Sequence, residues 1–143
     1  MTLYLDTSAL VKLYAREEGS TQVKRAVAQA GSIATSLVAY VETRSAFARK
    51  RRFADIDDAA LRHYKREFEQ DWTGFNRLPV DTITIRRAGD LAERYRLRAY
   101  DAVHLATAEL FQEAVRAAVD FVSFDDALNG AAVSQGFRLI ADA

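Results

Sequence analysis

Cysteine is absent from this chain of 143 residues, and proline, methionine and tryptophan each occur once. Without cysteine there is no disulfide framework, no zinc–cysteine site and no thiol nucleophile. No apolar run is long enough to span a membrane, and the first residues lack the basic segment of a secretory signal. We therefore expect a soluble, cytoplasmic protein with no membrane partner.

Net charge is also absent, because 20 Lys and Arg residues balance 20 Asp and Glu residues. The balance is uneven along the chain. Residues 44–100 carry fourteen basic and nine acidic side chains, whereas residues 101–143 carry two basic and seven acidic ones. The total charge thus gives no argument for nucleic-acid binding, but the basic middle segment leaves that argument open.

The length is typical of one domain, and the 50% apolar content excludes intrinsic disorder. Short apolar runs alternate with stretches of helical periodicity. This alternation predicts an α/β fold with a central, mostly parallel sheet of about five strands, flanked by helices on both faces. The strands are expected near 3–5, 32–35, 78–80, 121–123 and 137–140, with Ser20, Ser36 and Thr82 as N-caps of three of the intervening helices.

Four acidic residues lie at or near the ends of predicted strands, where such sheets bind ligands. Asp6 directly follows the first strand, Glu42 lies in the helix after the second, Asp101 begins a later helix, and Asp125 follows the fourth strand. Four carboxylates meeting at one edge would repel one another unless cations were present. Carboxylate oxygens are the ligands that Mg²⁺ and Mn²⁺ prefer.

Each of these acids also has an ordinary structural interpretation. Asp6 and Asp101 are common N-cap residue types. Glu42 can pair with a basic residue, since a buried carboxylate without a partner is costly. Of the adjacent Asp125 and Asp126, one can cap a helix while the other serves a site. Residue types alone leave these interpretations open.

Four segments resemble, in order, the signature motifs of PIN-domain nucleases. They are residues 5–14 (LDTSALVKLY), 41–46 (VETRSA), 97–108 (LRAYDAVHLATA) and 122–125 (VSFD). Together they span nearly the whole chain, and the length resembles that of single-domain VapC-type toxins. The resemblance implies one PIN domain over residues 1–143 and Mg²⁺-dependent hydrolysis of RNA, with Mn²⁺ able to substitute.

The resemblance also implies roles for individual residues. Asp6 and Asp101 match the primary metal ligands, and Glu42 and Asp125 complete the acidic site. Two serines, Ser8 and Ser123, match small hydroxyl positions that could hold a ligand carboxylate or a phosphate oxygen. Asp125 is chosen over its neighbour Asp126 by its distance from Ser123, and the number of metal ions stays open.

VapC-type relatives are toxins that cleave RNA and inhibit translation. They usually form homodimers, and a small VapB-like antitoxin neutralises them by inserting an arginine-bearing tail into the active-site groove. We therefore expect a toxin, a homodimer and an antitoxin partner for this chain. The alternative is a non-toxin PIN-domain nuclease that acts in RNA processing.

Several other side chains have both a functional and a structural interpretation. The basic runs at 44–52 and 94–98 could attract RNA or form a solvated surface. His104 is expected to be a packed histidine near the site rather than a ligand. Phe68 and Trp72 form an apolar stripe, which is typical of a core or a partner surface. Three aromatic residues are candidates for base stacking, although core packing is expected for each: Tyr40, Tyr100 and Phe124.

Overall fold

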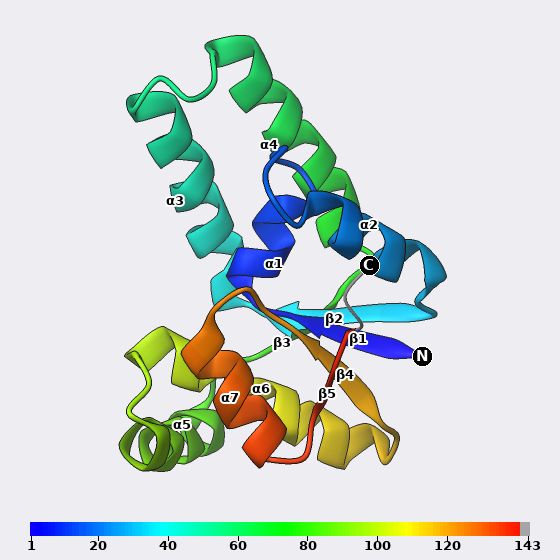
Figure 1. Cartoon of the computed structure of the whole chain (residues 1–143), viewed down its shortest axis with the longest axis vertical. Coiled ribbons are helices and arrows are strands. Elements are labelled where there is room, and N and C mark those ends of the chain that lie inside the picture. The colour runs from blue at the N-terminus through cyan, green and yellow to red at the C-terminus, as the bar shows by residue number, and fades with distance from the viewer. Residues whose placement is uncertain (141–143) are drawn as a thin grey trace.

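A five-stranded parallel sheet lies at the centre of the computed structural model, which describes residues 1–140 (Figure 1). The strand order is β3-β2-β1-β4-β5, and every neighbouring pair runs parallel. This confirms the α/β fold predicted from the sequence. The strands are β1 (Thr2–Leu5), β2 (Ser32–Ser36), β3 (Asn76–Leu78), β4 (Val119–Val122) and β5 (Arg138–Leu139).

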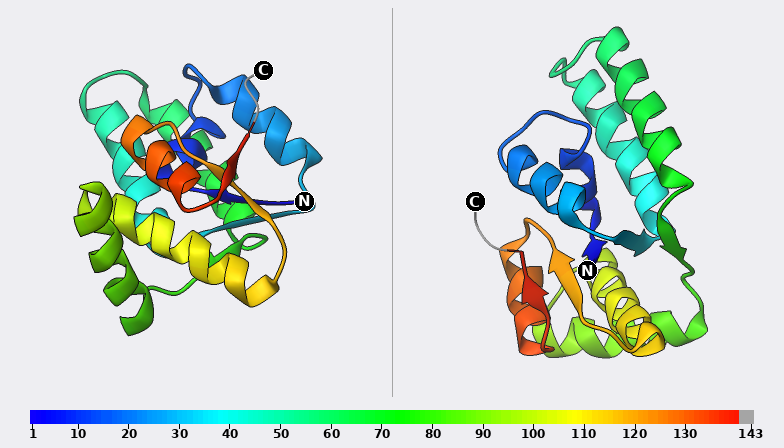
Figure 2. Two further views of the ribbon diagram at one scale, coloured as in Figure 1. Left: turned by 60° about the horizontal axis from the view of Figure 1, so that its bottom comes forward. Right: turned by 90° about the vertical axis from the view of Figure 1, so that its right-hand side faces the viewer.

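The helices of residues 1–140 cover both faces of this sheet (Figures 1 and 2). Within the same residues, no helix is both long and apolar enough to cross a membrane. On one face lie α1 (Thr7–Lys12), α2 (Ser20–Gln29), α3 (Val38–Arg52) and α4 (Asp58–Trp72). On the other face lie α5 (Thr82–Tyr95), α6 (Ala99–Val115) and α7 (Asp126–Ser134).

The strand order changes direction at β1. The chain proceeds from β1 outward through β2 to β3, and then returns to place β4 on the other side of β1. In parallel sheets, the crevice at such a reversal is the usual ligand site. The register pairs Leu5 with Val122, and the backbone N–H of Asp6 donates to the Val122 carbonyl at 3.1 Å. The residues that follow β1 and β4 are thereby brought side by side.

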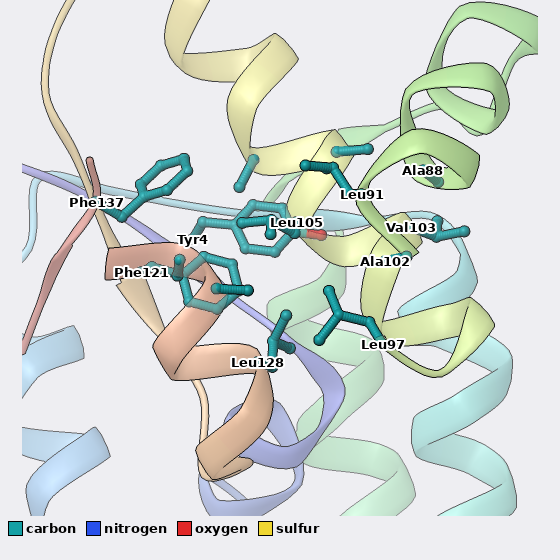
Figure 3. Close-up of a cluster of buried hydrophobic side chains, with 14 of the residues drawn as sticks. Tyr4, Ala88, Leu91, Leu97, Ala102, Val103, Leu105, Phe121, Leu128 and Phe137 are labelled. Atoms are coloured by element: carbon teal, nitrogen blue, oxygen red, sulfur yellow. The ribbon is translucent and has the colours of Figure 1, made fainter. Parts of the chain in front are cut away.

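Two hydrophobic cores hold the helices to the sheet. The core beneath α5, α6 and α7 is built around Tyr4, Leu105 and Phe121 (Figure 3). The core on the opposite face contains Phe68 and Trp72, which are 0% and 8% exposed. The stripe on α4 is therefore core within this chain rather than a surface free for a partner.

The start of α5 and the end of β3 differ from the prediction, in each case because of the chemistry of a neighbouring residue. Asp81, not Thr82, is the N-cap of α5, because its carboxylate accepts hydrogen bonds from the backbone N–H and hydroxyl of Thr84 at 2.9 Å each. Strand β3 ends at Leu78 rather than at residue 80, since Pro79 has no N–H to donate to the ladder.

The N-caps of α2 and α3 are also each displaced by one residue from the predicted positions. Leu37, not Ser36, is the N-cap of α3, although the Ser36 hydroxyl still accepts from Val38 N–H at 3.2 Å. Gly19, not Ser20, is the N-cap of α2 and adopts a positive φ of 90°. A Cβ at Gly19 would lie 2.6 Å from the ring of Phe124, so glycine also makes room for that ring.

Candidate functional site

A cavity of about 390 Å³ lies beyond the carboxyl ends of β1 and β4. All four acids expected from the sequence line it, although they come from four separate segments of the chain. Asp126 does not line this cavity; its side chain borders a separate one of about 230 Å³. The residues around the larger cavity are Asp6, Thr7, Ser8, Glu42, Arg49, Arg98, Asp101, His104, Phe124 and Asp125.

Asp6 is held by hydrogen bonds to both carboxylate oxygens. Oδ1 accepts from the Ser8 hydroxyl at 2.7 Å and from the Ala9 N–H at 3.0 Å, and Oδ2 accepts from the Ser123 hydroxyl at 2.6 Å. Asp6 is thus the N-cap of α1 and a cavity residue at once. Its side chain is buried, and burial raises the pKa of the carboxyl despite the charge of His104 and these three donors.

Glu42 projects from α3 and is anchored through one of its oxygens. Oε1 accepts from the Thr7 hydroxyl at 2.7 Å and lies 2.8 Å from Nε2 of His104. Burial acts to raise the pKa of Glu42, but the His104 hydrogen bond, the His104 charge and the Thr7 hydroxyl outweigh it and lower that pKa. Among residues 1–140, no lysine or arginine pairs with Glu42, so a histidine takes the place of the basic partner considered from the sequence.

Asp101 and Asp125 share one arginine. Nε of Arg98 lies 2.9 Å from Asp101 Oδ2, and a terminal nitrogen of the same guanidinium lies 3.0 Å from Asp125 Oδ2. Asp101 lies in the first turn of α6, and Asp125 is the N-cap of α7 through Leu128 N–H. Because the Arg98 side chain is 78% exposed, this pairing is weak and easily exchanged for another cation.

The donor set fits a hard divalent cation by its chemistry. Among residues 1–140, no group of three or more His, Asp or Glu residues is already gathered closely enough to enclose a metal ion. The four carboxylates nevertheless line one cavity, and Oε2 of Glu42 and Oδ1 of Asp101 have no hydrogen-bond donor in this part of the chain. Oxygen atoms of this kind are typical ligands of Mg²⁺ and Mn²⁺.

The basic residues of segments 44–52 and 94–98 differ in their partners and in their position relative to the cavity. Arg49 and Arg98 line the cavity. Other members of the runs pair instead with acids away from it: Arg44 with Glu69, Lys50 with Glu17 and Arg51 with Asp58. The four carboxylates of the lining outnumber its two guanidinium groups, so an anionic ligand would need a bound cation as well as the arginines to offset their charge.

The three aromatic candidates for base stacking also differ in their surroundings. Tyr40 packs against Phe68 and Trp72, so the core interpretation holds for it. Tyr100 is 61% exposed and does not line the cavity. Phe124 does line it, with the Lys12 ammonium 4.6 Å from the ring centroid.

Sequence reasoning missed Thr7. Its hydroxyl donates to Glu42 and also lies 3.2 Å from Nε2 of His104. The available signal was position alone, since Thr7 directly follows a strand-end aspartate and therefore lies at the same sheet edge. His104 itself is 2% exposed and lies beside the carboxylates, as the packed-histidine interpretation expected.

Comparisons with known proteins agree with this fold. The sequence model of the PIN-domain family matches residues 3–133. Ribonuclease VapC45 of Mycobacterium tuberculosis is 34% identical over 106 residues, which cover 74% of this chain and 74% of that protein. Ribonuclease VapC46 of Mycobacterium tuberculosis is 31% identical over 142 residues, covering 97% and 96%. The chain therefore belongs to the PIN-domain family, in its VapC-type group.

Two solved structures share the fold at low sequence identity. A structure of FitAcB from Neisseria gonorrhoeae superposes with a TM-score of 0.71 at 16% identity, covering 99% of this chain and 97% of that one. A toxin–antitoxin complex from Klebsiella pneumoniae superposes with a TM-score of 0.61 at 20% identity, covering 86% of each chain.

Proposed function

We propose that this protein is a divalent-metal-dependent endoribonuclease that hydrolyses RNA phosphodiester bonds, with Mg²⁺ as the metal and Mn²⁺ as a substitute. The observation that carries the proposal is the meeting of four carboxylates, from four separate segments, in one cavity at the strand ends. Membership of the VapC-type group supports it, because relatives in that group are ribonucleases by name.

Four residues are assigned to the metal: Asp6 and Asp101 as primary ligands, and Glu42 and Asp125 to complete the acidic site. A divalent cation held there supplies Lewis acidity that activates water and offsets the charge of the phosphate. Ser8 and Ser123 fix both oxygens of Asp6, so that this carboxylate is already oriented. The lowered pKa of Glu42 keeps this carboxylate ionised, so that it can hold a cation or orient a water molecule.

The cavity also has the groups needed to receive a polyanion. Arg49 and Arg98 line it, and we assign both to contacts with phosphate oxygens. A cation held by Asp101 and Asp125 would replace Arg98 as their partner, and the exposed guanidinium of Arg98 would then be available to the substrate. Phe124 offers a ring on which a base next to the cleaved bond can stack.

The metal requirement tests this function directly. Purified protein incubated with labelled RNA should cleave it in Mg²⁺, stop in excess EDTA and recover when Mg²⁺ or Mn²⁺ is restored, because the four carboxylates have no other cation of sufficient charge density. Gel analysis of the products checks this. Cleavage that continues unchanged in EDTA would contradict the proposal.

We further propose that the protein is the toxin of a toxin–antitoxin pair, that it inhibits translation through RNA cleavage, and that it works as a homodimer. Group membership and the fold shared with the Klebsiella pneumoniae toxin–antitoxin complex support this. An arginine from a VapB-like antitoxin could replace Arg98 between Asp101 and Asp125, which would block cation entry. The alternative is a PIN-domain nuclease in RNA processing.

Induced expression separates these two roles. A toxin should arrest growth of a bacterial host, and co-expression of a short open reading frame adjacent to its own gene should restore it, as measured by plating. An Asp101→Asn variant controls for the burden of expression. Normal growth on induction, with RNA cleavage retained in vitro, would favour the RNA-processing alternative.

A further inference from the structure

Two consecutive hydrogen bonds, one buried and one partly buried, join the hydrophobic core to the cavity. Tyr4 lies on β1 with no exposed surface, and its ring stacks on that of Phe121 at a centroid distance of 5.7 Å (Figure 3). Its hydroxyl oxygen lies 2.8 Å from Nδ1 of His104. Nε2 of His104 lies 2.8 Å from Oε1 of Glu42. These two hydrogen bonds therefore lead from a core aromatic residue to a cavity carboxylate.

The carboxylate of Glu42 sets the direction of its hydrogen bond with His104. An ionised carboxylate only accepts, so Nε2 of His104 carries a hydrogen and donates it to Glu42. In the neutral imidazole Nδ1 accepts from the Tyr4 hydroxyl, and in the charged imidazolium it donates to the hydroxyl oxygen, so Tyr4 is the partner of Nδ1 in both forms while Nε2 donates to Glu42. With the Thr7 hydroxyl also donating to Oε1, one oxygen of Glu42 is held by two donors.

His104 has little freedom to move. It is 2% exposed, and its ring meets that of Tyr4 edge-on at a centroid distance of 5.9 Å. Glu42 has more freedom, since its side chain is 27% exposed and holds several rotatable bonds. A carboxylate of this kind loses conformational entropy when it binds a cation, unless a rigid neighbour has already fixed it.

We propose that His104, supported by Tyr4, is a positioning residue that orients Glu42 so that its second oxygen, Oε2, is available to a cation in the cavity. His104 then acts through Glu42 and not on the substrate. The inference rests on the proposed function, because it assumes that the cavity binds a divalent cation. It adds two residues, one of them wholly within the core, to those that determine cation affinity.

Two amide variants separate hydrogen bonding from packing. The amide of His104→Gln reaches the position of Nε2 and can still donate to Glu42, whereas that of His104→Asn reaches only the position of Nδ1. Mn²⁺ titrated calorimetrically into each protein without RNA should bind about 10–100-fold more weakly to the Asn variant, the usual effect of losing a ligand's hydrogen-bond partner. The Gln variant should stay close to the wild type.

A second pair of variants tests the contribution of the core residue. Tyr4→Phe keeps the ring but removes the hydroxyl that is the hydrogen-bond partner of Nδ1, so Mn²⁺ affinity should fall by several-fold, within the same range. Tyr14→Phe is the matched control, because its hydroxyl bonds to Asp71 on α4 at 2.9 Å, away from the cavity. This variant should bind Mn²⁺ like the wild type. Thermal melting of all four variants verifies that each is folded.

The outcomes are distinguishable. Equal Mn²⁺ affinity in the wild type, His104→Asn and Tyr4→Phe would overturn the inference while leaving the proposed function intact. Equal weakening by the Gln and Asn variants would also overturn it, since packing rather than the hydrogen bond to Glu42 would then matter. A wild-type protein that binds no Mn²⁺ would remove the proposed function itself.

Discussion

Asp6→Asn is expected to lower the rate of RNA cleavage more than about 100-fold, because losing even an indirect partner of a metal ligand costs about 10–100-fold. The substitution removes the charge of the most buried of the four acids but keeps its shape. The remaining side-chain oxygen can still accept from Ala9 N–H and cap α1, and the new amide can donate to the Ser123 hydroxyl. Single-turnover cleavage of labelled RNA gives the rate.

The same variant should remain folded. Burial raises the pKa of Asp6, which means that the charged form is disfavoured in the folded state, so a neutral amide should not lower the free energy of unfolding. Asp81→Asn is the matched control: Asp81 caps α5 as Asp6 caps α1, but it does not line the cavity. Full activity in Asp6→Asn, or an equal loss in Asp81→Asn, would contradict the site assignment.

Phe68→Ala should lower the free energy of unfolding by about 3–5 kcal/mol, the usual cost of removing a fully buried aromatic ring. Phe68 has no exposed surface, and its ring contacts four other aromatic rings, one from the segment after α1, two from α3 and one from α4, with centroids 5.4 to 6.0 Å away. The total free energy of unfolding of such a domain is about 5–15 kcal/mol, so the loss is large. Urea denaturation followed by circular dichroism measures it.

Phe53→Ala makes the same chemical change on the surface. Phe53 follows α3 and is 68% exposed, so its removal should alter the free energy of unfolding by no more than about 0.5 kcal/mol. Similar losses in the two variants would show that Phe68 does not form the centre of this core. Such a result would favour the other interpretation of the α4 stripe, as a surface that binds a partner.

The elements that sequence reasoning predicted best are those with a strong periodic signal. The stripe of Phe68 and Trp72 indicated one face of a long helix, and α4 has that face buried. Short elements with competing signals were less predictable. α5 is capped by Asp81 rather than Thr82: aspartate is the better N-cap of these two adjacent residues, but a periodic pattern places a helix end only to within one or two residues.

The candidate site shows the same division at the level of individual residues. Asp6, Glu42, Asp101 and Asp125 were noted for their places after predicted strands and in helices, and they were assigned to the site by the resemblance to PIN-domain nucleases. Their hydrogen-bond partners were not predictable in this way. Thr7, Arg98 and His104 acquire their roles from side-chain directions in three different helices or loops, which no local pattern encodes.

By itself, the sequence determined the class of fold and the chemistry available at one edge of its sheet, because hydrophobic periodicity fixes the elements and strand ends fix where polar residues gather. Only the tertiary structure decided how those carboxylates are held. It made Asp6 a helix cap as well as a cavity residue, gave Asp101 and Asp125 a shared arginine, and tied Glu42 to Tyr4 through His104. Hydrogen bonds between residues far apart in the chain form only once β1, α3 and α6 are packed together, and packing is a property of the whole fold.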